Sequence, residues 1–273
     1  MSDVVVVQQK VLEILKQFIE ICEQEGLTYY ALGGTLLGAV RHQGFIPWDD
    51  DIDIGMPRAD YERFKLIAAK YLKSPYVFLS EDSPGYNKAF AVIRDSSTKI
   101  LMTYSQVAQE ESLWIDIFPL DGAPIGGWAR FVQEKRYLYR RMKVQLSQFS
   151  HLVNQKKTNR PFIERAIIGL ANKLHVERWI SFDKAQAKYI KAIKKYDLSA
   201  GAGGNYTGAY KLRELVPSDY FGQAAELPFE DISIRVPAKY HEYLVAIYGD
   251  NYMELPPADK QVPHQYQIIT LGE

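Results

Sequence analysis

The sequence predicts an α/β (α+β) fold, in which a core built around one mixed sheet carries an added basic helical lobe. Three observations predict it. Strand-like and helix-like patterns interleave over residues 1–126, a basic stretch of helical character follows, and a strand and a helix come near the end of the chain. The 273 residues, of which 47% are hydrophobic, suffice for one large domain or for a core with an extra lobe.

The core elements follow from periodicity and from turn residues. Apolar residues at helical spacing predict a helix over residues 8–25, with Gly26 as its C-terminal cap. Helices are also expected over 36–42 and 57–72. Between and after them, apolar or alternating runs bounded by Gly, Pro, Asp and Ser predict strands at 27–32, 51–56, 76–80, 90–94, 99–103 and 113–119. We assign residues 1–126 to this core.

The charge pattern changes after Gly126-Gly127. Residues 128–195 contain 17 Lys or Arg against 4 Asp or Glu, although the whole chain has 33 of each. We therefore treat 127–200 as a basic helical segment, with a break at 159–161, and 201–204 (Gly-Ala-Gly-Gly) as a flexible joint. Residues 201–273 form a C-terminal segment expected to pack back on the core, with a strand at 229–236 and a helix at 237–248.

The cysteine content and the hydropathy indicate the compartment. Cys22 is the single cysteine, which excludes a disulfide framework, and its helical spacing with apolar residues suits a small core side chain. No apolar run is long enough for a membrane span. The sequence therefore predicts a soluble, cytoplasmic protein.

Acidic residues on two predicted strands indicate a metal site. Because side chains alternate across a strand, Asp51 and Asp53 share one face while the isoleucines between and after them face the core. Asp116, between two isoleucines, repeats this arrangement. Neighbouring carboxylates repel one another unless a cation lies between them, and oxygen ligands favour Mg²⁺ or Mn²⁺. Asp49 shares the strand parity and could be an outer ligand. The alternative is a solvated sheet face with exposed acids.

Gly33-Gly34-Thr35 lies between a predicted strand and a predicted helix. Glycines at such a position let a phosphate approach backbone N–H groups, and a helix N-terminus favours an anion. A Gly-Gly pair is also often only a turn. The acidic strand that follows makes phosphate binding by these three residues the better interpretation.

The run from Gly33 to Ile54, GGTLLGAVRHQGFIPWDDDIDI, resembles the LicD family of choline phosphotransferases, which has a nucleotidyltransferase-like core and fukutin-related protein as a distant relative. Residues near the C-terminus resemble it too: Val236-Pro237, Tyr240, Leu244, 248–253 and Pro256-Pro257. The resemblance implies transfer of phosphocholine from CDP-choline to a sugar hydroxyl of a cell-surface glycan precursor, a teichoic acid or a lipopolysaccharide. It also implies a metal held by the acids.

Residues near the acids are candidates for contacts with such substrates. Arg41, Lys88 and Arg94 could bind phosphate, although single basic residues are more often solvated or paired at the surface. His42, or an outer carboxylate, could accept the hydroxyl proton. Choline is a quaternary ammonium and binds to aromatic faces, so Trp48 and Trp114 are the aromatic residues to consider, unless both only pack in the core.

The basic segment admits several interpretations. It could lie on the anionic inner face of a membrane that carries a lipid-linked acceptor, or it could bind a polyanionic acceptor chain. It could bind nucleic acid, which we expect less, or be a solvated helical face. Two other functions remain open for the chain. One is a nucleotidyltransferase that moves NMP to a small molecule or nucleic acid, and the other is a non-catalytic binding module on the same fold.

Overall fold

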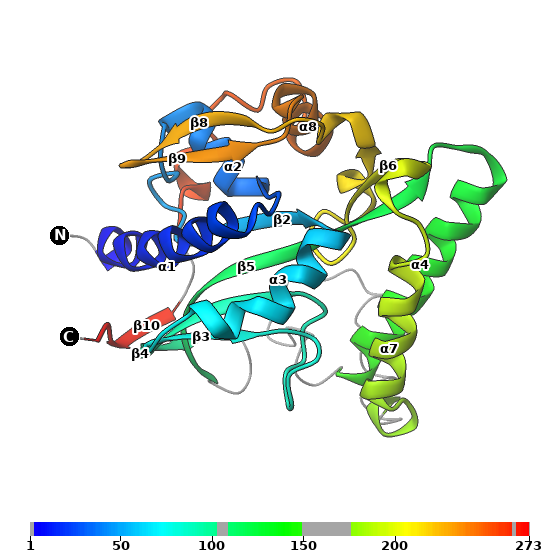
Figure 1. Ribbon diagram of the computed structural model, residues 1–273, viewed down its shortest axis with the longest axis horizontal. Coiled ribbons are helices and arrows are strands. Elements are labelled where there is room, and N and C mark those ends of the chain that lie inside the picture. The colour runs from blue at the N-terminus through cyan, green and yellow to red at the C-terminus, as the bar shows by residue number, and fades with distance from the viewer. Residues whose placement is uncertain (1–2, 103–108, 149–175, 264–265, 273) are drawn as a thin grey trace.

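The computed structural model describes residues 3–102, 109–148, 176–263 and 266–272. It has the predicted α+β fold, with helices packed on a mixed sheet (Figure 1). The strands of the main sheet are β1 (Tyr30–Ala31), β2 (Asp53–Pro57), β3 (Tyr76–Leu79), β4 (Ala91–Met102), β5 (Gln109–Pro124), β6 (Gly201–Asn205), β7 (Val216–Pro217) and β10 (Tyr266–Thr270).

Strand β5 is the centre of this sheet. Its residues 116–120 pair in parallel with β2, and 120–124 pair antiparallel with β6. Residues 109–117 of β5 pair antiparallel with β4, whose far edge pairs with β3 at one end and β10 at the other. Ile54 and Met56 of β2, and Ile115 and Ile117 of β5, are fully buried, so the residues between them face the opposite side of the sheet.

Helices α1 (Asp3–Glu25) and α3 (Arg58–Tyr71) cover one face of the sheet (Figure 1). The buried stripe of α1 includes Phe18, whose ring makes edge contacts with Tyr29 and with Phe64 of α3. Cys22 is fully buried in this layer, as its helical spacing predicts. These contacts form the main hydrophobic core. On the other face of β2 and β5, Asp53 and Asp116 lie beside the buried side chains of Phe118 and Leu120.

The helical lobe stands beside β6 at the right of Figure 1. Its described elements are α4 (Gly127–Ser147), the short helix η1 (Val176–Trp179) and α7 (Phe182–Ile193), and its small core contains Tyr137, Tyr189 and Tyr206. The break predicted at 159–161 lies outside the described residues. The flexible joint predicted at 201–204 is wrong, because these residues form the buried strand β6 between β5 and β7, with short helices η2 (Leu198–Ala200) and η3 (Lys211–Glu214) on either side.

Two further strand predictions are wrong in detail. The separate strands at 90–94 and 99–103 are one strand, β4, because the chain between Asp95 and Ile100 forms an irregularity in its pairing with β5 and not a turn. The single strand at 229–236 is a hairpin of β8 (Ala225–Phe229) and β9 (Ile232–Val236), whose turn places Glu230 at a φ of 54°. The strand at 27–32 shortens to β1, and Asp51 precedes β2 instead of lying within it.

The remaining elements pack above the N-terminal end of β2. Helix α2 (Gly33–His42) lies beside the β8–β9 hairpin and α8 (Tyr240–Tyr248), while the short helices η4 (Ser218–Tyr220) and η5 (Ala258–Lys260) lie in the connections. Gly249 ends α8, as the sequence predicts. Among the described residues, no helix combines the length and the apolar character that a membrane crossing needs.

Candidate active site

Two neighbouring parallel strands position the acidic residues. Asp53 opens β2 and is the register partner of Asp116 on β5. Asp51 lies two residues before Asp53, so it extends to the same side, while Ile52 is fully buried on the other. All three carboxylates line one cavity of about 240 Å³, which we call the acidic cavity. Strand alternation and parallel pairing thus bring together the three acids that the sequence singled out.

The start of α2 holds Asp53 and Asp49 in place. The Asp53 N–H donates to the Thr35 hydroxyl at 2.8 Å, and the Leu32 N–H donates to the Asp53 carbonyl at 2.9 Å. A Cβ at Gly33 would lie 2.9 Å from the Asp53 carboxylate, and one at Gly34 would lie 2.5 Å from the Asp49 carboxylate. The two glycines therefore admit carboxylates against the first turn of the helix, where the helix dipole favours negative charge.

Negative charge dominates the electrostatics of the acidic cavity. Burial, and after it the carboxylates of Asp51 and Asp116, raise the pKa of Asp53 well above its ordinary value. Burial also raises the pKa of Asp116 to about 6, against the opposing effect of Lys88. Acids that disfavour one another's ionisation in this way bind a cation favourably, because the cation offsets both the burial of their charge and the repulsion between them.

Lys88 and Trp114 both contact the Asp116 carboxylate. The Trp114 indole N–H donates to the Asp116 carboxylate at 2.7 Å, and the Lys88 ammonium lies 3.7 Å from the same oxygen. The ammonium also lies over the Trp114 ring at 4.6 Å and the Phe90 ring at 5.2 Å. Lys88 is therefore a fixed positive charge at the edge of the acids, well placed for an anionic group that enters the cavity.

A larger cleft of about 700 Å³ opens next to the acidic cavity and shares Asp51 and Asp53 with it. We call it the aromatic cleft, because Trp48, Tyr210, Tyr248 and Tyr252 line it together with Gly34, Arg41 and Asp49. The Arg41 guanidinium donates to the carbonyls of Tyr252 and Glu254, so it fastens the C-terminal loop to α2. A nucleotide could place its base among these rings and its phosphates toward the acids.

Other candidates lie farther from the acids. His42 accepts a hydrogen bond from Arg41 and packs against the edge of Trp48, and it lines neither the acidic cavity nor the aromatic cleft. Burial, and next the charge of Arg41, lower the pKa of His42. Arg94 pairs with Glu111 at 3.0 Å and also lines neither space. The structure thus brings Lys88 and Trp114 to the acids, but neither His42 nor Arg94.

The donor set has the chemistry of a hard-metal site without forming a closed cage. Within the described ranges, no three His, Cys, Asp or Glu side chains are arranged as a ready group of metal ligands. Mg²⁺ commonly binds through one or two carboxylates, water and substrate phosphates, and does not require an all-protein cage. Carboxylates that raise one another's pKa in a shared cavity fit that mode of binding.

Comparison with known proteins identifies the family. A family model described as LicD/FKTN/FKRP, nucleotidyltransferase domain, matches residues 26–141. The lipopolysaccharide cholinephosphotransferase LicD of Haemophilus influenzae is 33% identical over 259 residues, which make up 94% of this chain and 93% of that protein. The chain belongs to the LicD family. The resemblance that the sequence motifs predicted is therefore confirmed, and so is the nucleotidyltransferase-like character of the core.

A more distant LicD-family relative matches one segment only. The ribitol 5-phosphate transferases FKRP of human and mouse are 43% identical over 44 residues, or 16% of this chain and 9% of theirs. The LicD model itself spans β1 to most of α4, so it includes all three acids. The remaining lining residues of the acidic cavity, Asn205, 207–210 and Glu214, lie beyond the matched residues.

Glu214 is the site residue that sequence reasoning missed in this LicD-family chain. It is 3% exposed and lines the acidic cavity with Asp53 and Asp116, and its Oε1 has no hydrogen-bond partner among the described residues. Burial raises the pKa of Glu214 to about 8, against hydrogen bonds from Tyr210 and Asn205 that lower it. Its neighbours, Lys-Leu-Arg-Glu-Leu, have the composition of a solvated helix, and no local pattern marks this acid. Tyr210 and Tyr248, whose hydroxyls hydrogen-bond at 3.0 Å, were missed as well.

Proposed function

We propose that the chain moves phosphocholine from CDP-choline to a sugar hydroxyl of a cell-surface glycan precursor, a lipopolysaccharide or a teichoic acid. The observation that carries this proposal is the 33% identity, over 94% of this chain, with a protein named as a lipopolysaccharide cholinephosphotransferase. Full-length correspondence supports a shared enzyme class, because it includes the residues beyond position 141 that line the acidic cavity. Both the acids and the C-terminal wall of the cavity are therefore part of the match.

The acidic cavity is suited to phosphoryl-group transfer. Asp51, Asp53 and Asp116 would hold Mg²⁺ or Mn²⁺, with Asp49 in the adjoining aromatic cleft as an outer ligand, and the ion would neutralise charge on the donor diphosphate. Lys88 would bind a phosphate oxygen from the side of Asp116. The aromatic cleft, which joins the cavity at Asp51 and Asp53, would receive the cytidine part of the donor.

The acceptor hydroxyl needs a proton acceptor in the same cavity. The hydroxyl oxygen forms a bond to the phosphorus that carries choline, the bond from that phosphorus to the CMP oxygen breaks, and CMP leaves. Glu214 offers a carboxyl oxygen without a hydrogen-bond partner among the described residues, and in its ionised form it would take up the proton that the hydroxyl releases. His42, the alternative from the sequence, lies outside the cavity.

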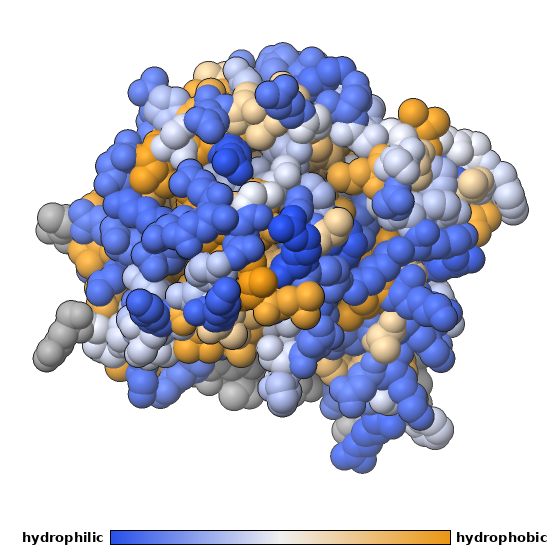
Figure 2. Space-filling model, viewed as in Figure 1, coloured by the Kyte–Doolittle hydropathy of each residue, from blue (hydrophilic) through white to orange (hydrophobic). Residues whose placement is uncertain are grey.

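An exposed apolar patch supports docking at the inner face of a membrane, where a lipid-linked acceptor would lie. Ile125 is 75% and Trp128 76% exposed at the start of α4, and the Trp128 ring stacks on Phe131 at 5.3 Å. Hydrophobic residues are visible at the right-hand edge of the surface in Figure 2, beside the position of α4. Aromatic side chains next to Lys135 and Arg136 are the combination that binds an anionic interface.

Product analysis tests the proposed reaction. The full chain is incubated with CDP-choline and Mg²⁺, with and without a glycan acceptor, and we expect CMP release and phosphocholine on the acceptor. A nucleotidyltransferase would instead release pyrophosphate from a nucleoside triphosphate. Pyrophosphate release, with no CMP formed from CDP-choline, would replace the proposal with that alternative. Absence of both products, together with no binding of CDP-choline, would favour a non-catalytic module.

A further inference from the structure

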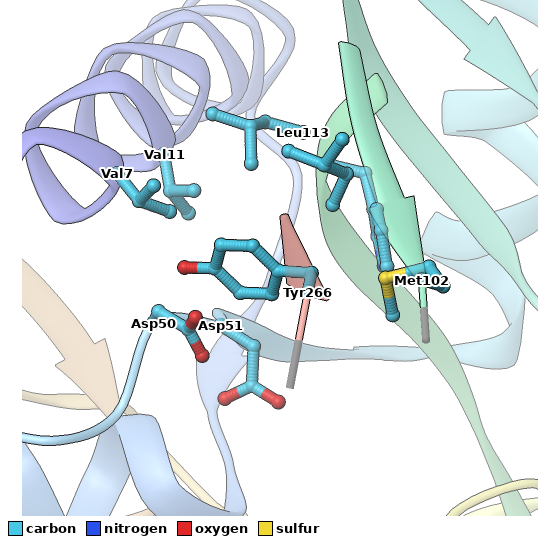
Figure 3. A pocket seen from close by; sticks show the side chains of 9 residues that line it. Val7, Val11, Asp50, Asp51, Met102, Leu113 and Tyr266 are labelled. Carbon is cyan, nitrogen blue, oxygen red and sulfur yellow. The ribbon is translucent and has the colours of Figure 1, made fainter. Parts of the chain in front are cut away.

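A second cavity lies behind Asp51, on the α1 side of the sheet edge. Its volume is about 290 Å³, several times the ~30 Å³ that a water molecule occupies in the liquid. Aliphatic side chains of α1, β4 and β5 form most of its wall, including Val11 and Met102, and Tyr266 of β10 and Trp114 of β5 add aromatic rings. We call it the α1 cavity (Figure 3).

Two acids close one end of this apolar space. Asp50 is 6% exposed and hydrogen-bonds the Tyr266 hydroxyl. Figure 3 shows that hydroxyl directed toward Asp50, whereas the Asp51 carboxylate points away from Tyr266. A cavity with apolar and aromatic walls and a carboxylate at one end suits a cation that carries alkyl groups and donates no hydrogen bond. A primary ammonium would leave N–H donors facing the aliphatic wall, which is unfavourable.

The α1 cavity adjoins the acidic cavity through shared residues. Asp51 lines both of them and the aromatic cleft, so the three spaces meet at this side chain. Trp114 links them a second time, because its ring lines the α1 cavity while its indole N–H donates to Asp116. A group attached by a short linker to a phosphate at Asp51 and Asp116 could therefore enter the α1 cavity.

We propose that the α1 cavity binds the trimethylammonium group of the phosphocholine that is transferred, with Tyr266 and Trp114 as its aromatic walls and Asp50 as its counter-charge. This assignment rests on the proposed function. It gives the two tryptophans different roles. Trp114 would bind the choline group, whereas Trp48 lines the aromatic cleft, which is the space assigned to the nucleotide. The cavity would then distinguish choline from ethanolamine by excluding hydrogen-bond donors.

Two variants on opposite walls test the assignment. Val11→Phe fills the cavity from α1, and Tyr266→Leu removes the ring from β10. We expect each to weaken binding of CDP-choline roughly thirtyfold, the equivalent of ~2 kcal/mol for a desolvated cation–π contact, and to change binding of CDP-ethanolamine less than about threefold. Val5→Phe, at an exposed position of the same helix, and Trp48→Leu, in the aromatic cleft, should leave the ratio of the two affinities unchanged.

A probe without nucleotide separates this proposal from the proposed function. Tetramethylammonium chloride should raise the melting temperature of the wild-type chain more than ammonium chloride at equal ionic strength, and Val11→Phe should lose that difference. If the wild type transfers phosphocholine but both variants affect the two donors equally, the cavity assignment is wrong and the function stands. If the wild type does not use CDP-choline yet keeps the tetramethylammonium effect, the cavity stands and the function is wrong. Absence of that effect in the wild type would overturn the assignment.

Discussion

Asp53 and Asp116 lie side by side as register partners on the parallel strands β2 and β5. Side chains at such positions lie on the same face of the sheet, and here no bulge or turn separates them. The pairing gives a site that depends on the rigid centre of the fold, because β5 also pairs with β4 and β6. Catalytic groups held by strands are positioned more precisely than groups on loops.

We expect Asp53→Asn and Asp116→Asn each to lower turnover at least about a hundredfold, because each removes a carboxylate from the proposed cation site. The chain without metal should keep its melting temperature or gain a little, since one of several repelling charges is gone. Turnover and thermal unfolding are measured on the same preparations. Asp231→Asn is the matched control, because this exposed acid pairs with Lys16 far along the chain from the site.

If either site variant kept normal turnover, that carboxylate would not belong to the reaction centre. If both variants unfolded while Asp231→Asn did not, the acids would instead be required for folding. A cation should also stabilise the wild type more than the variants: a site that is filled at a hundred times its Kd adds ~2.7 kcal/mol to the free energy of unfolding.

Glu214 predicts a pH dependence of stability for the metal-free chain. Burial raises its pKa to about 8 from an ordinary 4.5, so between these values the folded chain binds a proton that the unfolded chain has released. The stabilising contribution of the protonated carboxyl is therefore complete below about pH 4.5 and is lost as the pH rises toward 8. The slope is at most ~1.4 kcal/mol per pH unit.

We expect Glu214→Gln to flatten this part of the pH profile, measured by denaturant unfolding at several pH values, because the amide does not titrate. The quantity to compare is the difference in unfolding free energy between wild type and variant at each pH, since Asp53 and Asp116 titrate in both proteins. An identical slope in the two proteins would mean that Glu214 keeps an ordinary pKa. Turnover of the variant should fall as well if Glu214 accepts the hydroxyl proton.

Gly33 and Gly26 offer a matched pair for testing the start of α2. Both have a positive φ, 49° and 61°, so alanine strains either position by about 1–2 kcal/mol. A Cβ at Gly33 would also meet the Asp53 carboxylate at 2.9 Å, whereas one at Gly26 would meet nothing within 4 Å. We expect both alanine variants to lose similar stability in urea unfolding, and only Gly33→Ala to lose turnover. Equal turnover in the two variants would show that Asp53 tolerates displacement.

The acids could be predicted from the sequence because their signal is local. Alternating acid and isoleucine fixes which side chains share a face, and that pattern does not depend on which strands pair. Glu214 carries no such signal, because its burial comes from β6 and β7 bringing η3 against the sheet. Tyr266 likewise reaches Asp50 only because β10 pairs with β4, across more than 160 positions of sequence.

The strand errors have the same origin. Residues 95–97 have turn composition, yet β4 runs through them, because its first half pairs with β3 and β5 up to Asp95 and its second half pairs with β10 and β5, with an irregularity between Asp95 and Ile100. The glycines at 201–204 have the composition of a linker, but their lack of side chains lets β6 lie close to β5 and the segment before it. Tertiary packing decided each case against the local preference.

The last prediction concerns the basic lobe and its exposed aromatic patch. Arg141 does not belong to a membrane-facing surface, because it donates to the carbonyls of Tyr206 and Thr207 and ties α4 to the core. Charge reversal to Glu at Arg136, Arg140 and Lys143 leaves that contact intact. Each basic residue near an anionic surface contributes ~1 kcal/mol, so losing three should weaken vesicle binding by roughly a hundredfold before any added repulsion.

Co-sedimentation with phosphatidylserine-containing vesicles over a salt series measures this effect, with turnover of a short soluble acceptor assayed in parallel. Binding of the wild type should fall as salt rises, because the attraction fades over a Debye length of ~8 Å at physiological ionic strength. Reversal of Lys70, Lys73 and Lys260, which are exposed outside the lobe, is the control of equal charge and should bind more strongly than the lobe variant. Trp128→Ser should weaken binding at every salt concentration, because burial of an indole ring in the interface does not depend on ionic strength. Equal binding by the lobe variant and the control would leave α4 as a solvated helical face, and preference for RNA over vesicles would assign the charge to nucleic acid.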